Sequence, residues 1–143
     1  MSRVIPPVPD ADDEFFWDGV REHRLLLQAC ASCGALRHPP VPMCGHCLST
    51  HWRPQASTGT GSIHSWIVSR HPSEPDDTPR VVVLVELDDG VRFVANLVDT
   101  PLDEVRNELR VEVCFREVDG VVLPQFRPAD GRHPATDSAA GAR

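Results

Sequence analysis

The chain has 143 residues and a mass of 15.8 kDa, the size of one domain or two small ones, which excludes a large multidomain enzyme. Lys+Arg number 14 against 21 Asp+Glu, so the formal net charge of -7 disfavours non-specific binding to nucleic acid. All the basic residues are Arg, which excludes Schiff-base and P-loop lysines, and the 14 Pro favour short strands over long helices.

We expect no membrane-spanning segment in this sequence. Its longest apolar run, Val81–Val85, is far shorter than the roughly 20 residues that cross a bilayer. Residues 1–20 end in an acidic stretch and lack the basic, apolar pattern of a signal peptide. We therefore expect a cytoplasmic protein.

The first expected element is a short helix. It follows the Pro-rich residues 1–10, begins after Asp12 and Asp13, and ends near Glu22 or His23. It carries three consecutive aromatic residues, Phe15, Phe16 and Trp17. Because three neighbours on a helix cannot all face one side, we expect at least one of them to contact a partner, with packing over the next segment as the alternative.

Strand patterns dominate the rest of the chain. We expect strands at residues 25–29, 61–69, 81–87, 91–98, 110–118 and 121–126, a loop from Arg70 to Pro79 and a short helix at 100–107 capped by Thr100. In the strand at 61–69, simple alternation places Ile63, Ser65 and Ile67 on one face and His64, Trp66 and Val68 on the other. Asp89-Gly90 and Asp119-Gly120 supply tight hairpin turns.

The order of these elements predicts a mainly β fold. The last five strands, with a helix between the third and the fourth, follow the order of an OB-fold, a five-stranded Greek-key barrel. We expect an N-terminal helix and metal-binding ribbon over residues 12–56, the barrel over 57–129 and a disordered tail over 130–143.

Four cysteines indicate a metal site. Cys30, Cys33, Cys44 and Cys47 form two CxxC pairs separated by ten residues, which is the spacing of metal ligands. Zinc is the expected ion, iron remains an alternative, and disulfides are disfavoured in a cytoplasmic protein. Four thiolates fill a tetrahedral site, so the metal has a structural role and offers no position to a substrate.

The turns around the two cysteine pairs differ in sequence. Gly34 follows the first pair and permits the positive φ that such turns use, which points backbone N–H groups at the sulfur atoms. Leu48 holds the same position in the second turn, so we expect that turn to be less tightly wound. His46 and His51 are expected to be exposed and not to bind the metal.

Catalytic candidates are weak. Cys114 lies within a predicted strand without an adjacent base or helix N-terminus, so a half-buried packing thiol is favoured over a nucleophile. His64, His71, Ser65 and Ser69 provide the residue types of a hydrolase triad, but no motif fixes their geometry.

The segment between the cysteine pairs, Arg37–Pro42, is Pro-rich and is expected to be rigid and mostly extended. It presents Arg37 and His38. These residues either contact a phosphate-bearing ligand or a partner, or the segment is simply a stiff spacer.

The chain resembles the domain-of-unknown-function family thirty-five. The residues that carry the resemblance are the segment LLLQACASCGALRHPPVPMCGHC, the hairpin VELDDGVRFVANLV and the ending LPQFRPA, and the likeness covers about residues 12–129. It implies a rubredoxin-like zinc ribbon joined to an OB-fold. The absence of a glycine after Cys47 departs from the usual second turn.

The resemblance also implies a function. It predicts a non-catalytic subunit that binds a thiolase-like enzyme, an acyl transferase or steroid side-chain aldolase, or a hot-dog-fold hydratase, and that assists acyl-CoA handling. Partner or CoA contacts are then assigned to Arg37, His38, Phe15, Phe16 and Trp17. The alternatives are a single-stranded nucleic-acid binder, which the acidic barrel disfavours, and a stand-alone thioesterase.

Overall fold

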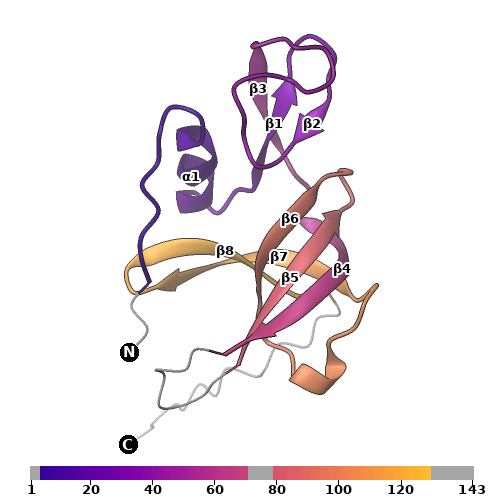
Figure 1. Ribbon diagram of the computed structural model, residues 1–143. Helices are drawn as coiled ribbons and strands as arrows, with labels where there is room; N and C mark the ends of the chain where they lie inside the picture. The colour runs from indigo at the N-terminus through magenta and orange to yellow at the C-terminus, as the bar shows by residue number, and fades with distance from the viewer. Residues whose placement is uncertain (1–3, 71–78, 130–143) are drawn as a thin grey trace, which may run out of the picture.

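The computed structural model describes residues 4–70 and 79–129. Its elements, in chain order, are α1 (Glu14–Arg21), β1 (Leu26–Cys30), β2 (Leu36–Arg37), β3 (Trp52–Ala56), β4 (Thr60–Ser69), β5 (Arg80–Leu87), β6 (Arg92–Leu97), the 3₁₀ helix η1 (Leu102–Glu104), β7 (Arg110–Val118) and β8 (Val121–Pro128). Figure 1 shows the small sheet of β1–β3 above the barrel formed by the other strands, with α1 beside the sheet. Residues 71–78 of the predicted loop and the predicted tail, 130–143, lie outside the described residues.

Helix α1 packs closely against the start of the small sheet. It begins after Asp13, as the acidic start predicts, and buries Phe16, Gly19 and Val20. Gly19 is required at this contact because a Cβ there would lie 2.8 Å from the Leu26 Cγ. The absence of a side chain thus lets the helix approach β1.

The small sheet has the strand order β2-β1-β3 and is antiparallel. The predicted strand at 25–29 is confirmed as β1, one residue further along the chain. Strand β3 was not predicted because Pro54 lies in its middle and lacks an N–H donor. An edge strand tolerates this loss, and β3 is at an edge of the sheet.

The remaining five strands close into a barrel with the order β4-β5-β6-β8-β7. Neighbours are antiparallel except β6 and β8, which run parallel where Leu97 pairs with Phe126. This arrangement confirms the OB-like barrel that the order of predicted strands indicates. Both hairpins are also confirmed, with Gly90 at φ 88° and Gly120 at φ 80°. The second turn has the two expected residues, whereas the first has three, residues 88–90, between Leu87 and Val91.

A bulge in β4 changes the side-chain pattern expected there. Pairing with β5 shifts between Ile63 and Ser65, so His64 is the extra residue. Ile63 is fully buried, whereas Ile67 is 63% exposed. The expectation that both isoleucines share one face was therefore wrong, because the bulge reverses the alternation after His64.

The predicted helix at 100–107 was also wrong in extent. Only the three residues of η1 form a 3₁₀ turn, and the Thr100 side chain does not cap it. Pro101 and Val105, on either side, are extended. Val105 is buried, so the chain returns to the barrel before a helix can develop.

One buried apolar cluster includes residues of both predicted parts of the chain. Phe16, Leu25 and Leu27 of the N-terminal part belong to the same cluster as Phe93 and Phe126 of the barrel. The ring centroids of Phe16 and Phe93 are 6.0 Å apart. In the described part of the chain, no helix has the length and apolar character needed to span a membrane.

Candidate functional site

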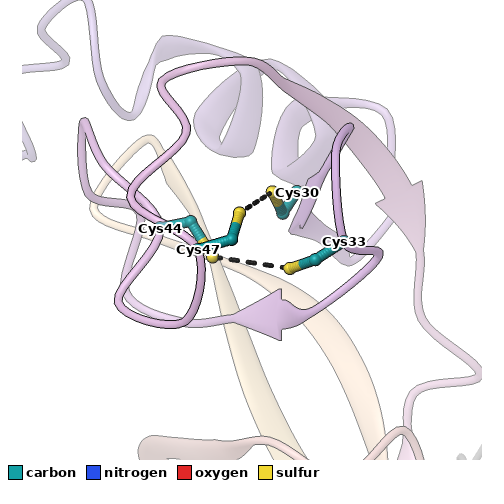
Figure 2. A group of neighbouring side chains, drawn as sticks. All are labelled: Cys30, Cys33, Cys44 and Cys47. Carbon is teal, nitrogen blue, oxygen red and sulfur yellow. Dashed lines mark hydrogen bonds between the residues drawn. The ribbon is translucent and has the colours of Figure 1, made fainter.

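The four cysteine thiols converge at one end of the small sheet (Figure 2). All four sulfur atoms lie within 4.8 Å of one another. The sulfur atoms of Cys30 and Cys47 are 3.6 Å apart, and those of Cys33 and Cys44 are 3.7 Å apart. A tetrahedral ion with metal–sulfur bonds of about 2.3 Å requires sulfur separations of about 3.8 Å. The two measured separations match a tetrahedral metal ion, and such an ion would hold the two turns together.

Hydrogen bonds from backbone N–H groups lower the pKa values of two of these thiols. The N–H of Cys33 is the main cause that lowers the pKa of Cys30, to about 6, and N–H groups of the second turn lower the pKa of Cys44. The N–H of Ala35 lowers the pKa of Cys33, but desolvation and the neighbouring thiols outweigh it and raise that pKa to about 11. A cation bound among the thiols would favour their thiolate forms.

The two turns are wound alike. Gly34 has φ 78° and Leu48 has φ 64°, and the N–H of each donates to the carbonyl of the first cysteine in its pair at 2.9 Å. The expectation of a looser second turn was therefore wrong. Leu48 is 66% exposed, and the open space around its side chain lets a residue with a Cβ adopt this conformation, at a cost of about 1 kcal/mol or more. His46 and His51 are exposed and lie outside the sulfur cluster, as expected.

Gln28 of β1 holds the segment between the cysteine pairs. Its side chain is 1% exposed, and its Oε1 accepts hydrogen bonds from the Arg37 Nε at 2.6 Å and the Val41 N–H at 2.9 Å. The Arg37 Nη2 also donates to the Val41 carbonyl at 3.3 Å. The segment Arg37–Pro42, which we call the linker, is therefore bent. The expectation that it is mostly extended was wrong. A single amide inside the apolar run of β1 was the sequence signal for this anchor.

His38, which follows Arg37, packs on the barrel. Its ring stacks on Phe93 with a centroid distance of 4.3 Å, and it also lies 5.3 Å from Phe16. Burial lowers the pKa of His38 to about 4, so the imidazole is uncharged at neutral pH. Sequence reasoning identified His38 but missed Phe93 as its partner, because nothing local relates the two residues.

The three helix aromatics are all at least partly buried. Phe16 is buried, Phe15 packs on Trp52 with a centroid distance of 4.5 Å, and the Trp17 Nε1 donates to the Asp13 carboxylate at 3.2 Å. Phe15 and Trp17 are half-buried, so neither is fully free as an anchor. The contact of this helix with a partner stays a prediction.

A groove of about 410 Å³ lies between α1, the bent linker and strands β6 and β8. We call it the linker groove. Its walls are mostly apolar and include Trp17, His38, Pro40, Phe93, Val94 and Leu123. Among the described residues that line it, Asp13 alone carries a charge at neutral pH.

The other catalytic candidates do not form a site in the described residues. Cys114 is half-buried, and burial is the main cause that raises its pKa, which disfavours the thiolate. No hydrogen bond between residues of 4–70 and 79–129 joins His64 to Ser65 or Ser69. His71 lies outside the described residues.

Two family models match the chain one after the other. Residues 17–53 match the model described as "ChsH2, rubredoxin-like zinc ribbon domain", and residues 54–116 match "ChsH2, C-terminal OB-fold domain". The first match contains all four cysteines, and the second covers most of the barrel. The metal site is therefore that of a zinc ribbon.

Two curated bacterial relatives are considerably longer. The "Probable enoyl-CoA hydratase alpha subunit" of Thermomonospora curvata is 42% identical over 125 residues, 86% of this chain and 39% of that protein. The "3-oxo-4,17-pregnadiene-20-carboxyl-CoA hydratase alpha subunit" of Mycobacterium tuberculosis is 42% identical over 97 residues, 67% of this chain and 31% of that protein. This chain thus spans less than two fifths of either relative.

Other relatives match along most of their length. A "DUF35 domain-containing scaffold protein" of Methanothermobacter thermautotrophicus is 30% identical over 115 residues, which is 75% of this chain and 86% of that protein. A solved structure described as "Ltp2-ChsH2(DUF35) aldolase" contains a chain that is 41% identical, with a TM-score of 0.79, over 86% of this chain and 98% of that one. The zinc ribbon, the barrel that follows it and these likenesses together show that the chain belongs to the DUF35 family, the domain-of-unknown-function family thirty-five.

Proposed function

We propose that this chain is a non-catalytic accessory subunit that binds a thiolase-like enzyme and assists the handling of its acyl-CoA substrate. The observation that carries the proposal is the likeness to a chain of the Ltp2-ChsH2(DUF35) aldolase, 98% of which is covered. A steroid side-chain CoA ester is the substrate class that the pregnadiene-carboxyl-CoA relative favours, and a hot-dog-fold hydratase is a further candidate partner. We also propose a cytoplasmic location, where thiols stay reduced and available to zinc.

The chemistry of the described residues supports an accessory role. Four thiolates fill a tetrahedral site, so a metal ion there has no position left for substrate or water. The raised pKa of Cys114 leaves its thiol protonated and weakly nucleophilic at neutral pH. We therefore assign bond making and breaking to the partner enzyme.

We propose that α1 and the linker form the surface that meets the partner. Phe15, Phe16 and Trp17 belong to α1, and Arg37 and His38 to the linker. Two Arg37 donors are engaged within the chain and His38 is stacked on the barrel, which favours a shaped protein contact over a direct contact of these residues with the CoA phosphates. Zinc would stabilise this surface, since its ligands flank the linker.

The nucleic-acid alternative is poorly supported by the barrel. Its sequence contains more acidic than basic residues. Two of its four aromatic residues, Phe93 and Phe126, are buried and cannot stack on bases. Trp66 and Phe115 are half-buried. We therefore retain the accessory role as the proposal.

Activity assays with the isolated chain and with purified Ltp2 test this proposal. The zinc-loaded chain alone should turn over no steroid side-chain CoA ester, whereas addition of the wild-type chain or of Cys114→Ala to Ltp2 should support retro-aldol cleavage equally. Robust turnover by the isolated chain that disappears in Cys114→Ala or His64→Ala would overturn the accessory role and favour the thioesterase alternative.

A further inference from the structure

The linker groove continues onto an uncovered apolar part of the barrel. Val94 of β6 lines the groove and is 62% exposed. Leu84 pairs with Val94 across the β5–β6 ladder, and Ile67 pairs with Val82, which also lines the groove. Since residues 82 and 84 alternate onto the same face, these side chains form one strip, which we call the barrel strip: Ile67, Val82, Leu84 and Val94.

The groove is built before any partner arrives. Phe16 and Phe93 hold the His38 ring between α1 and β6, and Gln28 fixes the bend of the linker through the Arg37 and Val41 hydrogen bonds. Little side-chain freedom is therefore lost when the groove is filled, which favours binding. Because burial keeps His38 uncharged, this wall of the groove repels neither cations nor apolar groups.

The carboxylates at and beside the linker groove determine which charge a bound group can carry. Asp13 lines the groove, and the exposed Asp10, Asp12 and Glu14 lie beside it in the chain. None of these four carboxylates forms an ion pair with a described residue. Asp13 already accepts hydrogen bonds from the Asp10 N–H and the Trp17 indole, and each of its oxygens keeps a further lone pair. The part of the groove at Asp13 therefore attracts a cation and repels the phosphates of CoA.

We propose that the linker groove and the barrel strip together bind an apolar segment of the thiolase-like partner that carries an arginine or lysine next to its apolar side chains. The cation meets Asp13, and the apolar side chains fill the groove and cover Val94 and Ile67. A small molecule of the usual ligand size would fit the groove, but it would leave the strip uncovered. This inference rests on the proposed function and adds the location and chemistry of the contact.

Titration of purified Ltp2 with variants of the zinc-loaded chain tests the inference. Val94→Arg places a cation in the groove, and because Val94 is exposed the substitution opens no space in the core. Leu102→Arg is the matched control, since Leu102 is 39% exposed and lies on η1, which Figure 1 shows at the opposite end of the barrel from the ribbon. We expect Val94→Arg to weaken binding about tenfold or more and Leu102→Arg to change it less than about twofold.

A second pair of measurements addresses charge and ligand. The double variant Asp12→Lys, Glu14→Lys should bind Ltp2 more weakly, and salt should weaken its binding less than that of the wild type. Unchanged binding of Val94→Arg, or equal weakening by Leu102→Arg, overturns the inference while the proposed function stands. Binding of a propanoyl-CoA probe to the isolated chain that Val94→Arg abolishes would also overturn it, in favour of a small-molecule site. If the wild-type chain does not bind Ltp2 at all, the aldolase form of the proposed function fails and the inference falls with it.

Discussion

His38 and Phe93 are stacked with their ring planes 15° apart, and they come from different parts of the chain. His38 follows β2 of the small sheet, whereas Phe93 lies on β6 of the barrel. The contact therefore fixes the linker against the barrel and gives the linker groove one of its walls.

This stack should make the stability of the protein sensitive to acid. The pKa of His38 is about 4 in the folded chain and 6.5 in the reference state, so the unfolded chain takes up the proton first. The free energy of unfolding should therefore fall as the pH decreases from about 6.5 to about 4. His38→Phe should remove this part of the pH dependence in urea unfolding with zinc present. His51→Phe is the control at an exposed histidine, and an equal effect of both variants would contradict the assignment.

The metal site should be lost when one ligand is removed. We expect about one zinc per chain in the wild type and none in Cys30→Ser or Cys47→Ser, with loss of the ribbon structure, because metal binding supplies much of the folding free energy of so small a sheet. Elemental analysis and circular dichroism measure both effects. Cys114→Ser, outside the cluster, should keep its zinc. Wild-type protein without stoichiometric metal, and with a spectrum that a chelator leaves unchanged, would refute this prediction.

The backbone of the second cysteine turn can be tested with a glycine. Leu48→Gly should raise the free energy of unfolding by about 1 kcal/mol, because glycine adopts the left-handed conformation at φ 64° without strain. Gly34→Ala should have the opposite effect of similar size, since Gly34 has φ 78° and open space around it. Thermal or urea unfolding with zinc present measures both, and destabilisation by Leu48→Gly would mean that the leucine side chain has a role within the chain.

Two glycines of the barrel should differ strongly in their tolerance of alanine. A Cβ at Gly61 would lie 2.3 Å from the Glu86 carbonyl oxygen and 2.9 Å from the Leu87 Cα, so Gly61→Ala must displace β5. We expect a loss of about 2 kcal/mol or more in the free energy of unfolding. Gly90→Ala meets no atom within 4 Å and should cost only about 1 kcal/mol, for its φ of 88°. Similar losses for both variants in urea unfolding would contradict the packing at Gly61.

Trp17 should contribute to the contact with the partner enzyme. It lines the linker groove and is half-buried in the isolated chain, so a partner can cover the rest of its surface. Under the proposed function, Trp17→Ala should weaken association with the thiolase-like partner by about 2 kcal/mol, roughly thirtyfold. Zinc content and melting temperature must first match those of the wild type, because Trp17 also packs on Phe16. If such a variant binds with wild-type affinity, the interface does not include Trp17 of α1.

The features that the sequence predicts well are those set by local patterns. The spacing of Cys30, Cys33, Cys44 and Cys47 was enough to predict the cluster, since each pair brings its two thiols together within its own turn. Alternating strands and the two Asp-Gly turns were likewise enough for the barrel. The boundary predicted after Ala56 stays a prediction.

The features that were missed depend on contacts between distant residues. The bulge at His64 reflects pairing with β5, and β3 exists despite Pro54 because β1 supplies a partner strand. The bend of the linker depends on Gln28, nine residues before Arg37. The buried amide of Gln28 is a local signal, but which residues it binds is not set locally, so the linker groove could not be predicted.

The apolar cluster shared by α1, β1 and the barrel limits how this protein can be divided. A cut between residues 53 and 54, where the two family matches meet, would leave Phe16 and Leu27 on one fragment and Phe93 and Phe126 on the other. Each fragment would then expose apolar surface that the intact chain buries, which favours aggregation or reassociation of the two. A chimera that takes its ribbon from another family member should therefore carry α1 and the facing residues of β6 and β8 along with the four cysteines.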